Sequence, residues 1–292
     1  MKLSAWLLFF SLCFYITQAG FSQSSFPARG FSSILDVSET EEKLNVFRDL
    51  LFHNQRNPDF HQGYLYQFEF THYPETGEPV THFGLLSGPS PESTTIRIDL
   101  TSGKGGTFAH TSFLLKRDSI NSTLWKWNKE KKLLSDVSAV DWLLPWVEGI
   151  NHSPFDLLMP FLNWPYQYEK SGRVCGRPAH LYIFTPPPNS PFYKSSFSSI
   201  RLAIDDAYHA PLRIEHMDGG ILPSRMFSLQ SFKKVEDRWV VKTIDVKERD
   251  SKSKTRFELI SAAHGLDLHE TTFEKSGLKN SINQSSIDFQ NL

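Results

Sequence analysis

The feature that most constrains this chain is an apolar run, residues 153–165, between two halves with the alternation of β-strands. The run is shorter than the about 20 apolar residues that a membrane-spanning helix needs. Ser153 suits a helix N-cap, and Pro154 suits the first helical position. Asp156 favours the positive end of a helix, and Pro160 then interrupts the run. The pattern predicts a short, kinked helix against a sheet, either as an ordinary core plug or as a lid over a cavity.

The two flanking halves have a period of two, which is typical of half-buried strands. One face of the strand from Gly63 is aromatic; its side chains are Tyr64, Tyr66, Phe68 and Phe70. Further along, Arg97 and Asp99 alternate with three aliphatic residues, and residues 166–260 return to the same pattern. Such alternation predicts a mainly β, antiparallel curved sheet with one apolar and one solvated face, and with short helices on its apolar side.

Composition allows a large core and excludes some partners. Of the 292 residues, 39% are hydrophobic and 14% aromatic, and aromatic rings suit both sheet interiors and apolar cavities. The formal net charge is −1, with no basic stripe, so we expect no nucleic-acid partner.

The N-terminus has the pattern of a cleavable secretory signal peptide over residues 1–19. Lys2 precedes an apolar stretch, and small residues at 17–19 offer a cleavage site. Leu12 before Cys13 makes a poor lipid-attachment motif, so we expect release into the periplasm. Cys175 is then the remaining cysteine, which excludes an internal disulfide and predicts a buried thiol.

The mature chain is predicted to form one domain over residues 34–278. Residues 20–33 precede it as a flexible lead-in, and residues 279–292 follow it as a flexible tail. Its one clear amphipathic helix has Ser38 as the N-cap and Glu41 as the reciprocal residue of a capping box.

Candidate chemistry is weak. The Gly-rich residues 102–107 have Lys in the wrong order for a phosphate loop, and a strand follows them. On a strand, Asp267 and His269 share a face but His264 points away, which argues against a metal site. Cys175 has no neighbouring base in sequence to make it a nucleophile. We therefore expect no catalytic residues, no metal and no cofactor, and the protein is not predicted to be an enzyme.

Several motifs together resemble the LolA-like branch of outer-membrane lipoprotein-sorting proteins. They are residues 176–181 (GRPAHL), 204–205 (ID), Tyr208, 211–215 (PLRIE) and 239–242 (WVVK), with 124–127 (LWKW) and 154–164 in the first half. The resemblance covers roughly residues 63–278. It implies a half-open antiparallel β-barrel, closed by helices, whose apolar cavity carries lipoprotein acyl chains through the periplasm. An inner-membrane donor and an outer-membrane acceptor would be its partners, and we expect a monomer.

The predicted cavity lining combines the aromatic strand face with Trp, Phe and Leu side chains of later segments. Its members are Tyr64, Tyr66, Phe68, Phe70, Trp125, Trp127, Trp142, Trp146, Phe155 and Leu158. Lipoprotein acyl chains or another lipid are the expected ligands. Two alternatives stay open: an envelope sensor or binding module on the same sheet with its hollow filled by side chains, and a hydrolase with a dispersed site.

Overall fold

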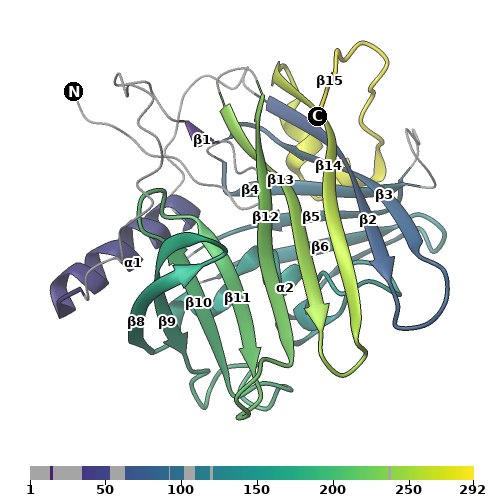
Figure 1. Cartoon of the computed structure of the whole chain (residues 1–292). Helices are drawn as coiled ribbons and strands as arrows, with labels where there is room; N and C mark the ends of the chain where they lie inside the picture. The colour runs from purple at the N-terminus through teal and green to yellow at the C-terminus, as the bar shows by residue number, and fades with distance from the viewer. Residues whose placement is uncertain are drawn as a thin grey trace.

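The computed structural model describes residues 14–15, 35–52, 63–91, 93–101, 109–118, 121–235 and 238–292. Antiparallel strands form one sheet, in the order β7-β6-β5-β4-β3-β2-β14-β13-β12-β11-β10-β9-β8 (Figure 1). The first half contributes β2 (Gly63–Tyr73), β3 (Val80–Gly88), β4 (Thr95–Thr101), β5 (Ala109–Lys116), β6 (Thr123–Asn128) and β7 (Leu133–Asp136). The second half contributes β8 (Tyr166–Val174), β9 (Arg177–Phe184), β10 (Ser199–Asp205), β11 (Pro211–Met217), β12 (Arg225–Val235), β13 (Arg238–Glu248) and β14 (Ser253–Leu266).

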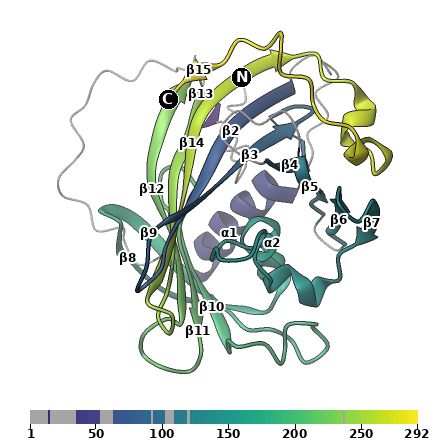
Figure 2. The same cartoon turned by 90° about the vertical axis from the view of Figure 1, so that its right-hand side faces the viewer.

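The strand order explains why an apolar segment links the two halves. The first meander starts at β2 and ends at the edge strand β7, whereas the second starts at the opposite edge, β8, and ends at β14 beside β2. Residues 137–165 must therefore run from one edge of the sheet to the other. They cross its concave side, where α2 (Pro154–Leu158) and α1 (Val37–Phe52) both lie (Figure 2). The sheet is curved and open, as predicted.

Helix α1 covers the concave side with Leu44, Phe47 and Leu51, all of them buried. Its capping box lies two residues before the predicted one. The Glu39 amide donates to Asp36 Oδ1 at 2.8 Å, and the Asp36 amide donates to Glu39 Oε2 at 3.2 Å. The prediction of Ser38 as the N-cap was wrong, because the preceding D-x-x-E has the same reciprocal pattern and caps the helix first.

The outer face of the sheet differs from the solvated face that alternation predicted. Arg97 and Asp99 of β4 are paired and almost fully buried, with Arg97 Nε 2.9 Å from Asp99 Oδ2. The covering segment contains η3 (Glu270–Phe273) and η4 (Ser276–Lys279), and Arg97 donates to the carbonyl oxygens of Gly277 and Asn280. Part of the expected flexible tail therefore packs on the sheet, and β15 (Gln290–Asn291) pairs with β14.

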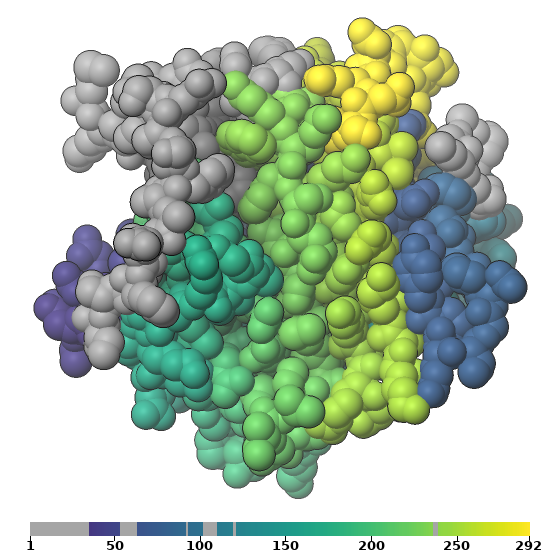
Figure 3. Space-filling view, viewed as in Figure 1, coloured from purple at the N-terminus to yellow at the C-terminus, as the bar shows by residue number. Residues whose placement is uncertain are grey.

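On another part of the outer face, Figure 3 shows the side chains of β12, β13 and β14 running continuously along the sheet. Cys175 lies at the turn between β8 and β9 with a φ of 50°, and its thiol is exposed. The prediction of a buried thiol was wrong, because the tight hairpin places this residue at its tip.

Three predicted segments fall outside the described residues: the lead-in 20–33, the Gly-rich loop, and the signal peptide apart from β1 (Phe14–Tyr15), which pairs with β13. Within the part of the chain that the structure describes, no helix combines the length and the apolarity that crossing a bilayer requires.

Candidate functional site

Helix α2 is fixed at its N-terminus by a buried polar cluster. Ser153 is the N-cap, as predicted, and its amide donates to Asp156 Oδ2 at 2.9 Å. Arg225 of β12 donates to both carboxylate oxygens of Asp156, at 2.6 and 2.5 Å, and to the Asn151 carbonyl at 2.5 Å. The Asn151 amide in turn donates to Thr255 Oγ1 of β14 at 2.9 Å. The start of the helix is thus tied to β12 and β14, the two strands on either side of β13.

The charges in this cluster are set by burial and pairing. Burial alone would raise the pKa of Asp156, but the charge and hydrogen bonds of Arg225 lower that pKa below its usual value. Burial lowers the pKa of His152 and of His216 to about 3, with the Arg225 charge acting in the same direction. Both imidazoles are therefore neutral at physiological pH beside an ionised Asp156–Arg225 pair.

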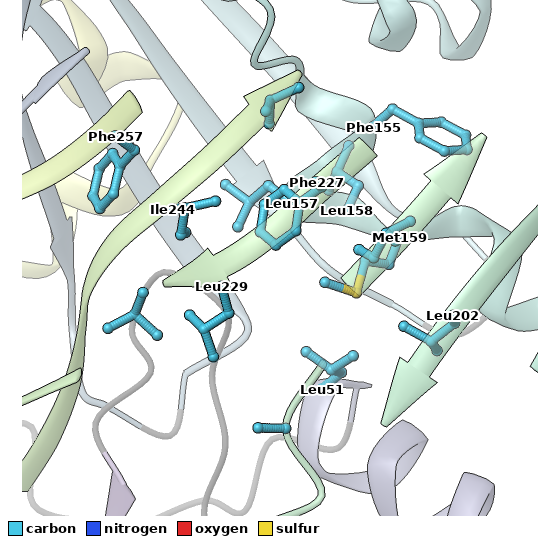
Figure 4. Close-up of a cluster of buried hydrophobic side chains, with 14 of the residues drawn as sticks. Leu51, Phe155, Leu157, Leu158, Met159, Leu202, Phe227, Leu229, Ile244 and Phe257 are labelled. Carbon is cyan, nitrogen blue, oxygen red and sulfur yellow. The ribbon is translucent and has the colours of Figure 1, made fainter. Parts of the chain in front are cut away.

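The apolar side of α2 faces the inner surface of the sheet. Leu157, Leu158 and Met159 lie opposite residues of β10, β12, β13 and β14, as Figure 4 shows. Phe155 is fully buried, and its ring centroid lies 5.1 Å from that of Phe192 and 5.7 Å from that of Phe197. The helix therefore plugs the concave side of the sheet.

The predicted kink follows α2 directly. Met159 adopts a left-handed conformation with a φ of 46°, and η2 (Pro160–Asn163) begins at the next residue. Before α2, the same segment forms η1 (Ala139–Leu143). The connecting segment therefore contains three short helical pieces, η1, α2 and η2.

The aromatic face of β2 points into the concave side, as predicted, and its rings fill the space there. Phe68 and Phe70 lie against Phe257, at centroid distances of 5.2 and 5.7 Å, and Phe70 lies 4.9 Å from His152. Tyr64 and Tyr66 are equally buried. A Cβ atom added at Gly84 would come within 2.3 Å of the Phe68 ring, so this glycine makes room for the aromatic stack. Aromatic side chains therefore pack closely against one another in this region.

Two predicted lining residues lie on the other side of the sheet. Leu124 of β6 pairs with Leu115 on the core face, so its neighbours Trp125 and Trp127 point outward. There they lie under the C-terminal segment, with Lys275 Nζ 4.4 Å from the Trp125 ring centroid and Lys279 Nζ 5.7 Å from that of Trp127. The geometry assigns these two tryptophans to the packing of the C-terminal segment.

A surface groove of about 590 Å³ is lined by the β5–β6 connection, the segment from the end of β7 to η1, the residues around η2, and the β9–β10 connection. Its apolar wall includes Trp142 of η1, Trp164 after η2, and Phe192 of the β9–β10 connection. Phe192 lies 6.3 Å from Trp142 and 5.8 Å from Trp164, measured between ring centroids. The remaining lining is Asp118, residues 121–124, Asp136, Val137, Ala139, Pro160, Asn163, Pro187 and residues 189–191. The volume is in the range of small-molecule sites.

The predicted residues thus divide into three groups. Trp142 lines the groove, and Phe155 lies directly behind it against Phe192. Leu158, Trp146 and the four β2 aromatics form the core beneath, where Trp146 packs on Phe113 at 4.9 Å. Trp125 and Trp127 form the third group, which lies on the outer face of the sheet under the C-terminal segment.

Sequence reasoning missed three residues of this region. Trp164 belongs to the apolar run but was not selected, and Phe192 lies in a proline-rich connection without any periodicity. Arg117 lies one position past β5 with its side chain 3% exposed, and its Nε donates to the Leu157 carbonyl at 3.1 Å. Arg117 continues the alternation of the core residues Phe113 and Leu115, and a charged residue in that register was the signal that could have found it. In the described ranges no three His, Cys, Asp or Glu side chains are grouped to hold a metal ion.

Comparisons with known proteins identify the fold. No protein-family model matches the chain, and no curated protein matches it in sequence. Among solved structures, a domain from Vibrio parahaemolyticus described as an outer membrane lipoprotein-sorting protein is similar with a TM-score of 0.64 and 16% identity, over 83% of this chain and 97% of that one. A DUF1329 family protein from Desulfovibrio piger has a TM-score of 0.64 and 15% identity, over 84% and 100% of the two chains.

A LolA superfamily protein from Nitrosomonas europaea is also similar, with a TM-score of 0.55 and 10% identity, over 80% of this chain and 96% of that one. These likenesses extend over most of the length of every chain compared. The protein therefore has the LolA-like fold that its motifs predicted.

Proposed function

We propose that this protein is a periplasmic carrier that binds acyl chains of lipoproteins, or of another lipid, for sorting to the outer membrane. The observation that carries the proposal is the surface groove whose aromatic wall consists of Trp142, Trp164 and Phe192. It lies in a fold shared with a domain described as a lipoprotein-sorting protein. The signal-peptide pattern of residues 1–19 supports a periplasmic location.

The groove offers the surface that such a ligand needs. Burial of an acyl chain contributes about 0.8 kcal/mol per CH₂, so a chain of about sixteen carbons requires an apolar lining worth on the order of 10 kcal/mol to leave a bilayer. Aromatic side chains bury large areas and are suited to this task. A long chain would occupy the groove and extend toward Phe155, which lies behind Phe192.

A second candidate is an envelope sensor or binding module that transports nothing. The filled space between α2 and β2 favours it, because the β2 aromatics leave their face to core packing. Such a module would use the groove for a protein segment in place of a lipid. The hydrolase hypothesis has the least support, because the polar cluster around Asp156 is buried and fixes α2 to the sheet.

Native mass spectrometry of protein purified from the cell envelope separates the two candidates. The carrier predicts adducts with the mass of a lipid or lipoprotein, which disappear after delipidation and return when lipid is added. The sensor hypothesis predicts the mass of the protein without bound lipid, or the mass of a complex with a polypeptide alone. Absence of any lipid adduct, even after cross-linking, would contradict the carrier proposal.

A further inference from the structure

Arg117 is a buried cation whose pairing is incomplete. Its backbone amide donates to the Thr94 carbonyl at 3.0 Å, and its Nε donates to the Leu157 carbonyl of α2 at 3.1 Å. Neither Nη1 nor Nη2 has a hydrogen-bond partner among the described residues, although both are inaccessible to solvent. Two nitrogens of the guanidinium therefore face the interior without an acceptor.

The charge of Arg117 persists at neutral pH. Burial lowers the pKa of its guanidinium to about 10, and Tyr64 acts weakly in the opposite direction. In the described part of the chain no carboxylate forms an ion pair with it. A buried charge without a counter-ion is strongly unfavourable, and proteins normally pair it or bind an ion there.

The position of Arg117 connects it to the groove. It directly precedes Asp118, and Thr123, which lies opposite Lys116 on β6, is also a groove residue. Arg117 is thus next in sequence to the groove lining, and its side chain extends to the Leu157 carbonyl of α2. A ligand that fills the groove and enters beside α2 would reach the guanidinium with its inner end.

We infer that Arg117 is the counter-ion for the acidic head group of a single-chain lipid, with the chain lying in the groove. The inference rests on the proposed function and narrows its ligand class. Nη1 and Nη2 form the end of the planar guanidinium, which can donate two parallel hydrogen bonds to the two oxygens of one carboxylate. A hydroxyl head group could accept one of these hydrogen bonds but would leave the guanidinium without a counter-charge.

Two ligands of equal chain length test the inference: palmitate and hexadecanol, titrated at neutral pH by displacement of a fluorescent fatty-acid probe. Hydrogen bonds to a charged group predict about tenfold or greater preference for palmitate in the natural protein. R117Q should remove that preference and leave the affinity for hexadecanol unchanged. R117K keeps the charge without the planar fork and should fall between the two. R173Q, which alters an exposed arginine of β8, is the matched control and should behave as the natural protein.

The outcomes are separable. Equal affinity for palmitate and hexadecanol, with no effect of R117Q, would overturn the inference and leave the proposed function standing. Binding of acetate as tight as that of palmitate would overturn it too, by making Arg117 a site for small anions. Failure of both long chains to bind would count against the proposed function itself. Because R117Q could perturb folding, its retained hexadecanol affinity and circular dichroism spectrum serve as the check.

Discussion

The guanidinium of Arg225 holds both carboxylate oxygens of Asp156, with Nη1–Oδ1 and Nη2–Oδ2 distances of 2.6 and 2.5 Å. Asp156 belongs to the short helix α2, and Arg225 begins β12, 69 residues later. The ion pair therefore connects the N-terminus of α2 to strand β12 of the sheet. Its free-energy contribution, and that of the neighbouring histidines, can be measured.

Removing one partner of this buried pair should be costly. R225M leaves the Asp156 carboxylate buried without its cation, and we expect the free energy of unfolding to fall by about 3–5 kcal/mol. The double variant D156L/R225M should lose less than R225M, because no buried charge is left unpaired. Chemical denaturation measures both. R249Q, which breaks an exposed pair with Asp218, is the control and should cost under about 1 kcal/mol. If R225M and R249Q lower the free energy of unfolding equally, the Asp156–Arg225 pair does not fix α2 to the sheet.

Acidification should destabilise the fold through the buried histidines. The pKa of His152 is about 3 in the folded protein and about 6.5 in the unfolded chain, so between these values the unfolded chain binds a proton that the folded one excludes. Its contribution is complete above about pH 6.5 and is lost as pH falls toward 3, by about 1.4 kcal/mol per pH unit. His216 acts in the same sense.

The variant H152L tests this coupling. His152 lies against Phe70 and Phe227, at ring distances of 4.9 and 6.5 Å, and neither of its nitrogens has a described hydrogen-bond partner. Leucine can occupy that apolar space without titrating. Unfolding free energies of H152L between pH 4 and 6 should therefore depend on pH less steeply than those of the natural protein, by about one proton's slope. If the unfolding free energies of H152L and of the natural protein depend on pH equally, His152 is not the group responsible for the acid destabilisation.

The C-terminal segment should depend on Gly277. A Cβ atom there would lie 1.8 Å from the Thr271 carbonyl oxygen, and the Gly277 carbonyl accepts from Arg97 at 3.1 Å. We expect G277A to destabilise the protein by about 1–3 kcal/mol through overpacking. It should also shift tryptophan fluorescence to longer wavelength as Trp125 and Trp127 become hydrated. Gly172 has open space around it, so G172A is the control. Unchanged fluorescence in G277A would argue that the segment does not cover the tryptophans.

Local patterns predicted the plug well, because its determinants are adjacent in sequence. Ser153, Asp156 and Pro160 define the cap and the end of α2 within a few residues, and the structure retains all three roles. At α1 the same kind of reasoning failed, since D-x-x-E and S-x-x-E overlap and sequence alone does not rank them.

Prediction of the site residues was limited mainly because the sequence does not show which face of each strand lies on the concave side of the sheet. Alternation showed that Trp125 and Trp127 share a face, but period two carries no information about which face is concave. The burial of Arg97 and Asp99 also depends on a segment more than 170 residues away. Phe192 lies in a proline-rich connection without any periodicity, so no local pattern indicated that it lines the groove.

Quenching of tryptophan fluorescence by a brominated acyl chain tests the central claim most directly, because bromine quenches only the indoles it contacts. The account predicts that brominated palmitate quenches the natural protein, and that W142F/W164F loses most of this quenching. W239F, which alters a partly exposed tryptophan of β13, should retain it. Equal quenching in the natural protein and in W142F/W164F, or none in either, would contradict the account of a lipid bound in the groove.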